Sequence, residues 1–134
     1  NNVIDHQSVL VNFESGATGT HNMVGGATRG MRTIHITGTK GEIFGDLEDG
    51  KFTISMIDPR PGCEFCETVV DVSVKDDSHG GGDLLLSEDF VDYVVGGEPS
   101  ISCTSIQDSM KGHLAVFLAD ESRENGGQVL PIIL

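Results

Sequence analysis

The sequence is poor in several kinds of residue, and each shortage excludes a class of protein. Tryptophan is absent and tyrosine occurs once in 134 residues, so we expect an aliphatic core whose larger members are Phe13, Phe44, Phe52, Phe90 and Phe117. Only 8 lysines and arginines stand against 21 aspartates and glutamates, and the net charge of −13 repels phosphate backbones and anionic lipid. No run of about 18 apolar residues occurs. We therefore expect a protein that binds neither nucleic acid nor membrane.

Cysteine is also scarce. The three thiols of Cys63, Cys66 and Cys103 are too few, and odd in number, for a disulfide framework, which favours a reducing cytoplasm. Cys63 and Cys66 have the C-x-x-C spacing of zinc sites and redox motifs. A structural zinc site needs four ligands, and no second C-x-x-C follows. A redox pair opens a helix, whereas Pro61 and Gly62 precede this one, so we interpret the pair as incidental loop cysteines.

The first half of the chain alternates apolar and polar residues, as strands do. Val9, Val11 and Phe13 form one apolar face of the first such segment, and Asp49-Gly50 between two segments indicates a hairpin turn. Six strands are expected, at residues 6–13, 17–24, 32–37, 42–47, 51–57 and 68–74.

Helical spacing replaces this alternation in the second half. Asp83 follows a glycine run and is expected to cap a helix that ends near Val95. Thr104 and Gln107 have the spacing of a capping box for a second helix, which ends near Asn125.

This order of elements predicts the α+β class. A last short strand is expected over residues 128–133, at a sheet edge because it contains Pro131. The expected architecture is a mostly antiparallel open sheet of six to seven strands, with two or more helices packed on one face. Because both faces of the strands carry apolar residues, the uncovered face is expected to join further copies of the chain in a homo-oligomer.

Four ordered segments carry a resemblance to a known family. They are Asp5-His6 with V-N-F-E-S-G-A at 11–17, R-T-I-H-I-T-G-T-K-G-E-I-F-G at 32–45, H-G-G-G-D at 79–83 leading into E-D-F-V at 88–91, and A-D-E-S-R at 119–123. Together they resemble the C-terminal domain of the Gfo/Idh/MocA oxidoreductases, the group of glucose–fructose oxidoreductase and inositol dehydrogenase. The resemblance spans nearly the whole chain and implies that residues 1–134 form one C-terminal domain for substrate binding and oligomerisation.

Members of this family have an N-terminal Rossmann domain that binds NAD or NADP, a lysine in an E-K-P motif and a D-x-x-x-H pair. None of these motifs occurs here: the glycines at 25–30 lie between β-segments, and those at 80–82 lack the G-x-G-x-x-G spacing. The chain starts at Asn1-Asn2 without a methionine, so it is expected to begin inside a longer product. We expect NAD or NADP in the full-length protein, and neither cofactor nor activity in this fragment alone.

His79 is the residue whose surroundings most suggest a ligand site. It precedes three glycines and a helix start, where backbone N–H groups and positive potential face a ligand. A histidine there can donate a hydrogen bond to a sugar hydroxyl or help a proton to move, and Asp83 can accept from hydroxyls. From the residues alone, a solvated loop histidine and a capping aspartate are the favoured interpretation; the resemblance reverses this for His79, while capping remains a sufficient explanation of Asp83. The resemblance implies that this loop faces the substrate cleft, and His79 and Asp83 are the substrate-binding candidates.

The other ionisable residues have structural explanations. His21 and His35 are expected in strands, and His113 beside the apolar stripe of the second long helix, where structural roles are commoner than catalysis. Arg29 and Arg32 suit a carboxylate or phosphate ligand, but ion pairs are the favoured use in so acidic a chain. No catalytic residue or metal site is assigned, because hydrolase-elbow and calcium-loop motifs are absent from the sequence.

Three functions are open at this stage. The first is a domain of an NAD(P)-dependent oxidoreductase that acts on a secondary alcohol of a sugar, polyol or related compound. The second is a domain of an NAD-dependent glycosidase of the same superfamily, which would release sugar from an aryl glycoside without net cofactor turnover. The third is a non-enzymatic dimerisation module, which would form a dimer with no cleft near His79.

Overall fold

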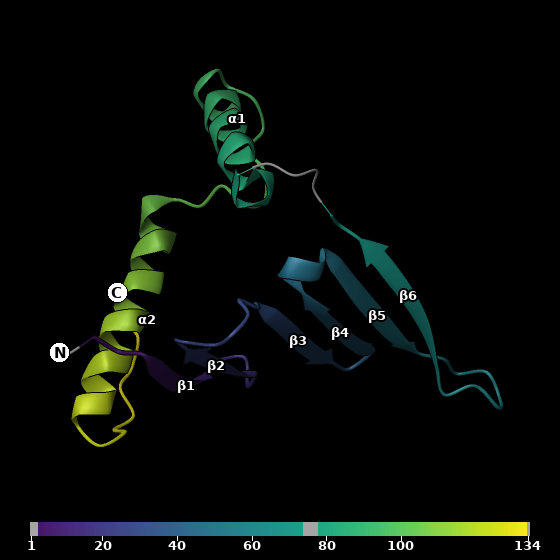
Figure 1. The fold of residues 1–134 in the computed structure, drawn as a ribbon, viewed down its shortest axis with the longest axis horizontal. Coiled ribbons are helices and arrows are strands. Elements are labelled where there is room, and N and C mark those ends of the chain that lie inside the picture. The colour runs from purple at the N-terminus through teal and green to yellow at the C-terminus, as the bar shows by residue number, and fades with distance from the viewer. Residues whose placement is uncertain (1–2, 74–77, 134) are drawn as a thin grey trace. The chain divides into compact units, whose positions relative to one another are not determined.

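The computed structural model describes residues 3–73 and 78–133 (Figure 1). The chain divides into two compact units, one of residues 27–86 and one of the residues on either side, and each is described by itself. The elements in chain order are β1 (His6–Asn12), β2 (Thr18–Val24), β3 (Thr33–Gly38), β4 (Gly41–Asp46), η1 (Leu47–Asp49), β5 (Lys51–Ile57), β6 (Phe65–Asp71), η2 (Ser78–Gly81), α1 (Gly82–Val94) and α2 (Ile106–Glu124). None of the described helices is both long and apolar enough to cross a membrane.

The α+β class is confirmed: six antiparallel strands are followed by two α-helices. The strands form two open sheets, β1-β2 and β3-β4-β5-β6. The expected strand over residues 128–133 is wrong, because this segment has no regular structure. Pro131 lacks an N–H for a strand ladder, and the carbonyl oxygen of Gln128 accepts instead from the hydroxyl of Ser122 at 2.7 Å. That the helices pack on one sheet face stays a prediction.

The four-stranded sheet has an uncharged face, which we call the apolar face. In the antiparallel register Ile36 lies opposite Ile43, and Ile43 lies opposite Ile54. Side chains alternate along each strand, so this register assigns every strand residue to one face or the other. The apolar face consists of Ile34, Ile36, Gly38, Gly41, Ile43, Gly45, Phe52, Ile54, Met56, Cys66, Thr68 and Val70.

The opposite face of this sheet, the polar face, mixes charged, hydroxyl and apolar side chains. It includes His35, Glu42, Ser55, Glu67 and Val69. One face is therefore uncharged and the other carries charged side chains, a difference that the expectation of apolar residues on both faces did not include.

The expected phenylalanine core is wrong. No apolar side chain of the described residues is fully buried; Phe13, Phe44, Phe90 and Phe117 are more than half exposed, and Phe52 is half-buried. The side chains on one face of a sheet are covered only at their base, by the sheet itself. They become buried when another layer of secondary structure packs against that face. Large apolar surfaces consequently face solvent in both units.

The turn between β4 and β5 contains the expected Gly50 but is longer than a two-residue hairpin. Oδ1 of Asp46 accepts hydrogen bonds from the backbone N–H groups of Glu48 at 3.0 Å and Arg32 at 3.3 Å, and η1 forms after it. Gly50 then takes a φ of 62°, the left-handed conformation that glycine adopts without strain.

The expected bounds of the sixth strand are shifted by three residues. Strand β6 occupies residues 65–71 instead of 68–74, because Phe65 pairs with Ile57 across the hairpin; Val74 lies outside the described residues. In β1 the expected alternation is confirmed, since Val9 and Val11 are half-buried while Leu10 is exposed.

Helix α2 is capped by Ser105, and the expected capping box of Thr104 and Gln107 is wrong. Oγ of Ser105 accepts from the backbone N–H of Asp108 at 3.2 Å and also donates to Oδ2 of Asp108 at 2.7 Å. This side-chain hydrogen bond, with the charge of Lys111, holds the pKa of Asp108 below its usual range. The serine thus satisfies one of the free N–H groups of the first helical turn.

We expect Ser105→Ala to lower the free energy of unfolding by about 1 kcal/mol, because the cap is lost. Thr104→Ala is the matched control and should cost less, since Oγ1 of Thr104 pairs with the hydroxyl of Ser109 at 3.3 Å and not with a helix N–H group.

The lowered pKa of Asp108 also predicts a pH dependence of stability. The ionised carboxylate stabilises the fold fully above about pH 5, and this contribution is lost as the pH falls below about 3.9. Urea unfolding followed by circular dichroism measures the stability of each variant and its pH dependence. A larger loss of stability in Thr104→Ala than in Ser105→Ala would show that Thr104 is the capping residue after all.

Candidate functional site

The candidate site is the turn where η2 leads into α1. His79 lies in η2 with a φ of 53°, and no other non-glycine residue in the described ranges has a positive φ. Such a backbone is uncommon for histidine and is typical of tight or functional turns. Gly81 also has a positive φ, of 78°, and α1 begins at the next residue. Two left-handed residues thus turn the chain immediately before the helix.

The two candidate binding residues contact each other. Nδ1 of His79 lies 2.8 Å from Oδ2 of Asp83, and the side chains are 82% and 66% exposed. A contact between two such exposed side chains adds little to stability. Its main effect is to orient the imidazole.

Asp83 does not lie at the cap position ahead of α1, contrary to expectation. The helix begins at Gly82, so Asp83 lies inside its first turn. A carboxylate at that position interacts favourably with the helix dipole. It also weakens the positive potential that an anionic ligand would meet, so the turn suits a neutral hydroxylated ligand better than a phosphate.

The remaining histidines belong to other elements, and His35 contacts a carboxylate of its own sheet. Nε2 of His35 lies 2.7 Å from Oε2 of Glu42 on the polar face, and its ring meets Phe44 edge-on with centroids 5.8 Å apart. His21 lies in β2 and His113 in α2. Within residues 3–73 and 78–133, no three histidine, cysteine or acidic side chains form a group that could hold a metal.

The two arginines that suited an anionic ligand form ion pairs, as favoured. Nη2 of Arg29 lies 3.0 Å from Oδ1 of Asp49. Nε and Nη2 of Arg32 donate to Oε1 of Glu48 at 2.9 and 2.7 Å. Both arginines therefore anchor the residues around η1, and neither is directed to the η2–α1 turn by these contacts.

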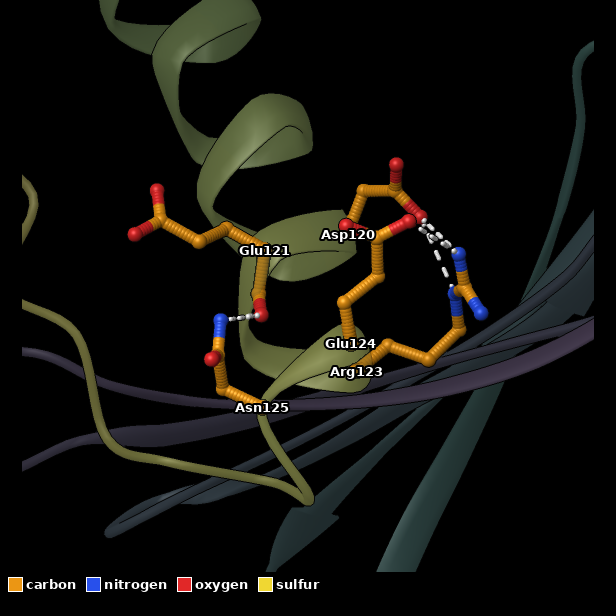
Figure 2. Close-up of polar contacts among 5 residues, drawn as sticks. All are labelled: Asp120, Glu121, Arg123, Glu124 and Asn125. Atoms are coloured by element: carbon orange, nitrogen blue, oxygen red, sulfur yellow. Dashed lines mark hydrogen bonds and ion pairs between the residues drawn. The ribbon is translucent and has the colours of Figure 1, made fainter.

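The A-D-E-S-R segment at 119–123 forms the last turns of α2, where its side chains and those of the next two residues make polar contacts (Figure 2). Oδ1 of Asp120 accepts from Nε and Nη2 of Arg123 at 2.9 and 2.7 Å. This bond raises the pKa of Arg123 above its usual range. The side-chain amide of Asn125 donates to the carbonyl oxygen of Glu121 at 2.8 Å, which satisfies an acceptor at the helix end. The segment therefore has a local structural role.

The interpretation of Cys63 and Cys66 as loop cysteines is right for Cys63 and wrong for Cys66, which lies in β6 opposite Met56. Both thiols are exposed and unbridged. The N–H of Asp58 donates to the carbonyl oxygen of Glu64 at 3.2 Å, so the paired backbone extends past Phe65 toward Cys63. Cys66 lies in a strand and Cys63 in the turn before it, so the pair lacks the helix start at which a redox pair lies.

A hollow that sequence reasoning missed lies at one end of the polar face. Its volume is about 400 Å³, and Oγ of Ser55 donates to Oε1 of Glu67 at 3.3 Å beside it. The lining residues are Thr37, Gly38, Gly41, Glu42, Ser55, Ile57, Glu64, Phe65 and Glu67. All of them except Glu64 come from four strands, so only the strand register could have shown that they meet.

Comparisons with known proteins leave the chain without an assigned family. No protein-family model, no curated protein and no solved structure matches it.

Proposed function

We propose that this chain is the substrate-side domain of an NAD(P)-dependent oxidoreductase of the Gfo/Idh/MocA type. The proposed substrate carries a secondary alcohol, as in a sugar, a polyol or a related compound. Four sequence segments in the family's order support the proposal. The contact between His79 and Asp83 carries the site, because it joins two hydrogen-bonding groups at an exposed turn that suits neutral hydroxyls.

The described residues do not fit a nicotinamide dinucleotide. A dinucleotide site joins a parallel strand to a helix through a glycine turn. The described strand pairs are all antiparallel, and α1 follows the short η2. We therefore assign NAD or NADP to another part of the parent protein, and the role of this chain is to bind and orient the alcohol.

The test is a titration of the ¹⁵N-labelled chain with D-glucose and, separately, with inositol, followed by amide chemical shifts. We expect changes centred on residues 79–83, which His79→Ala should weaken about fivefold or more, as loss of one hydrogen bond does. His113→Ala, a histidine of α2, is the matched control and should bind as the parent chain does. Unchanged shifts at 79–83, or changes confined to the hollow on the polar face, would contradict the proposal.

An assay of the complete gene product separates the enzymatic alternatives. Reduction of NAD or NADP by an alcohol substrate is expected, and His79→Ala should lower kcat/KM with the oligomer intact. Sugar release from an aryl glycoside without net cofactor turnover would instead indicate the glycosidase. Full activity in His79→Ala would remove this residue from the site.

We also propose that the apolar face of the four-stranded sheet joins a second copy of the chain. The chain has a net charge of −13, so two copies repel each other over most surfaces. The apolar face has no charged residue, and it combines isoleucines with three glycines. In a two-fold dimer the same surface of each copy faces itself, so it must be complementary to itself. An uncharged aliphatic face meets this requirement because it does not place like charges opposite each other.

A further inference from the structure

We propose that Asp83 is a positioning residue, which fixes His79 as the tautomer with the proton on Nδ1 and leaves Nε2 to accept a hydrogen bond from a ligand hydroxyl. This inference rests on the proposed function for its ligand, but its first half concerns the free protein. It also specifies the direction of the hydrogen bond, which the sequence left open between donor and proton carrier.

The geometry leads to this assignment in two steps. Nδ1 of His79 lies 2.8 Å from Oδ2 of Asp83. A neutral imidazole has one N–H and one lone pair, and an ionised carboxylate has no proton to donate. The shared proton is therefore on Nδ1, and the lone pair of the neutral ring is on Nε2. A carboxylate that accepts from one ring nitrogen of a histidine fixes its tautomer in the same way at many ligand sites.

The same molecule contains a histidine with the opposite arrangement. In His35 the nitrogen that contacts a carboxylate is Nε2, at 2.7 Å from Oε2 of Glu42. The same reasoning puts the proton of His35 on Nε2 and its lone pair on Nδ1. His35 is therefore an internal reference, because one spectrum should show two histidines protonated on different nitrogens.

The consequence for binding is a requirement for a donor on the ligand. Nε2 of a neutral His79 accepts from an O–H, so a ligand hydroxyl that points at His79 must keep its hydrogen. A methyl ether at that hydroxyl retains the oxygen but loses the donor. The site should therefore discriminate between an alcohol and its methyl ether, although both have nearly the same shape near the ring.

The experiment is long-range ¹H–¹⁵N correlation of the imidazoles in the free chain at about pH 8.5, where histidine side chains are neutral. We expect Nδ1 of His79 at the protonated position and Nε2 at the unprotonated position, with the reverse for His35. Asp83→Ala should change the tautomer ratio of His79 about fivefold toward Nε2–H, the ratio that one net hydrogen bond produces. Asp92→Ala removes another carboxylate from α1 and should leave His79 unchanged.

The outcomes separate the two proposals. A protonated Nε2 on His79 in the parent chain, or an unchanged ratio in Asp83→Ala, overturns the positioning role even if sugars shift the amides of 79–83. The predicted tautomer with no response to D-glucose or inositol leaves the positioning role standing and defeats the proposed ligand. Where a sugar binds, its methyl ethers at each hydroxyl in turn should include one that binds at least about fivefold more weakly; equal binding of all of them overturns the acceptor role.

Discussion

Gly41→Ala is expected to unfold the four-stranded sheet, with a loss of roughly 3 kcal/mol or more in the free energy of unfolding. Gly41 opens β4 with a φ of 152°, a conformation that side-chain-bearing residues rarely adopt. A Cβ atom there would lie 2.1 Å from the backbone oxygen of Ser55 and 2.9 Å from the Cα of Met56. Both are backbone atoms of the paired strand β5, so the overlap can be relieved only by separating β4 from β5.

Gly38→Ala provides the matched control in the same β3–β4 turn. A Cβ at Gly38 would meet the carbonyl oxygen of Gly41 at 3.6 Å, an ordinary contact, and this variant should stay within about 1 kcal/mol of the parent chain. Denaturant unfolding followed by circular dichroism measures both variants. Similar stabilities for the two would show that the β4–β5 register differs from the one described.

Val70→Asp is expected to weaken self-association by about 100-fold or more, because it puts a charge in the proposed dimer contact. Val70 is half-buried on the apolar face, where it pairs with Phe52. A carboxylate on this face would lie between two aliphatic surfaces without a partner, and each dimer would contain two of them. Sedimentation velocity over a range of concentrations measures the dissociation constant.

Val69→Asp is the control for this variant, since it introduces the same charge one residue away on the opposite face. Val69 is 63% exposed on the polar face, so an aspartate there stays in contact with water. We expect it to leave the dissociation constant nearly unchanged. A monomeric parent chain at every concentration, or equal loss of association in both variants, would contradict association through the apolar face.

The sequence predicted those parts of the fold that depend on local alternation. Val9 and Val11 indicated the inner side of β1 correctly, and the turn at Gly50 was expected because glycine adopts the left-handed backbone. The start of β6 depends instead on the pairing of Phe65 with Ile57, a long-range choice that a run of alternating residues does not specify.

Helix starts and the candidate site show the same limit. Ser105 and Thr104 are adjacent residues that both suit a cap, and the backbone decides which hydroxyl reaches the helix N–H groups. His79 and Asp83 were named from their place near a helix, but their contact depends on a left-handed histidine, which sequence spacing does not indicate. The hollow on the polar face could not be predicted without the pairing register of four strands, which the sequence does not give.

The absence of charge from the apolar face has a cost for selectivity. Ion pairs and buried polar groups let an interface reject a wrong partner, because a mismatch leaves them unsatisfied. The apolar face contains one hydroxyl, on Thr68, and otherwise consists of aliphatic, aromatic, thioether, thiol and glycine positions. Such a surface distinguishes partners by shape alone. It would tolerate exchange among isoleucine, valine and leucine over evolutionary time, while a single acquired charge would end its use.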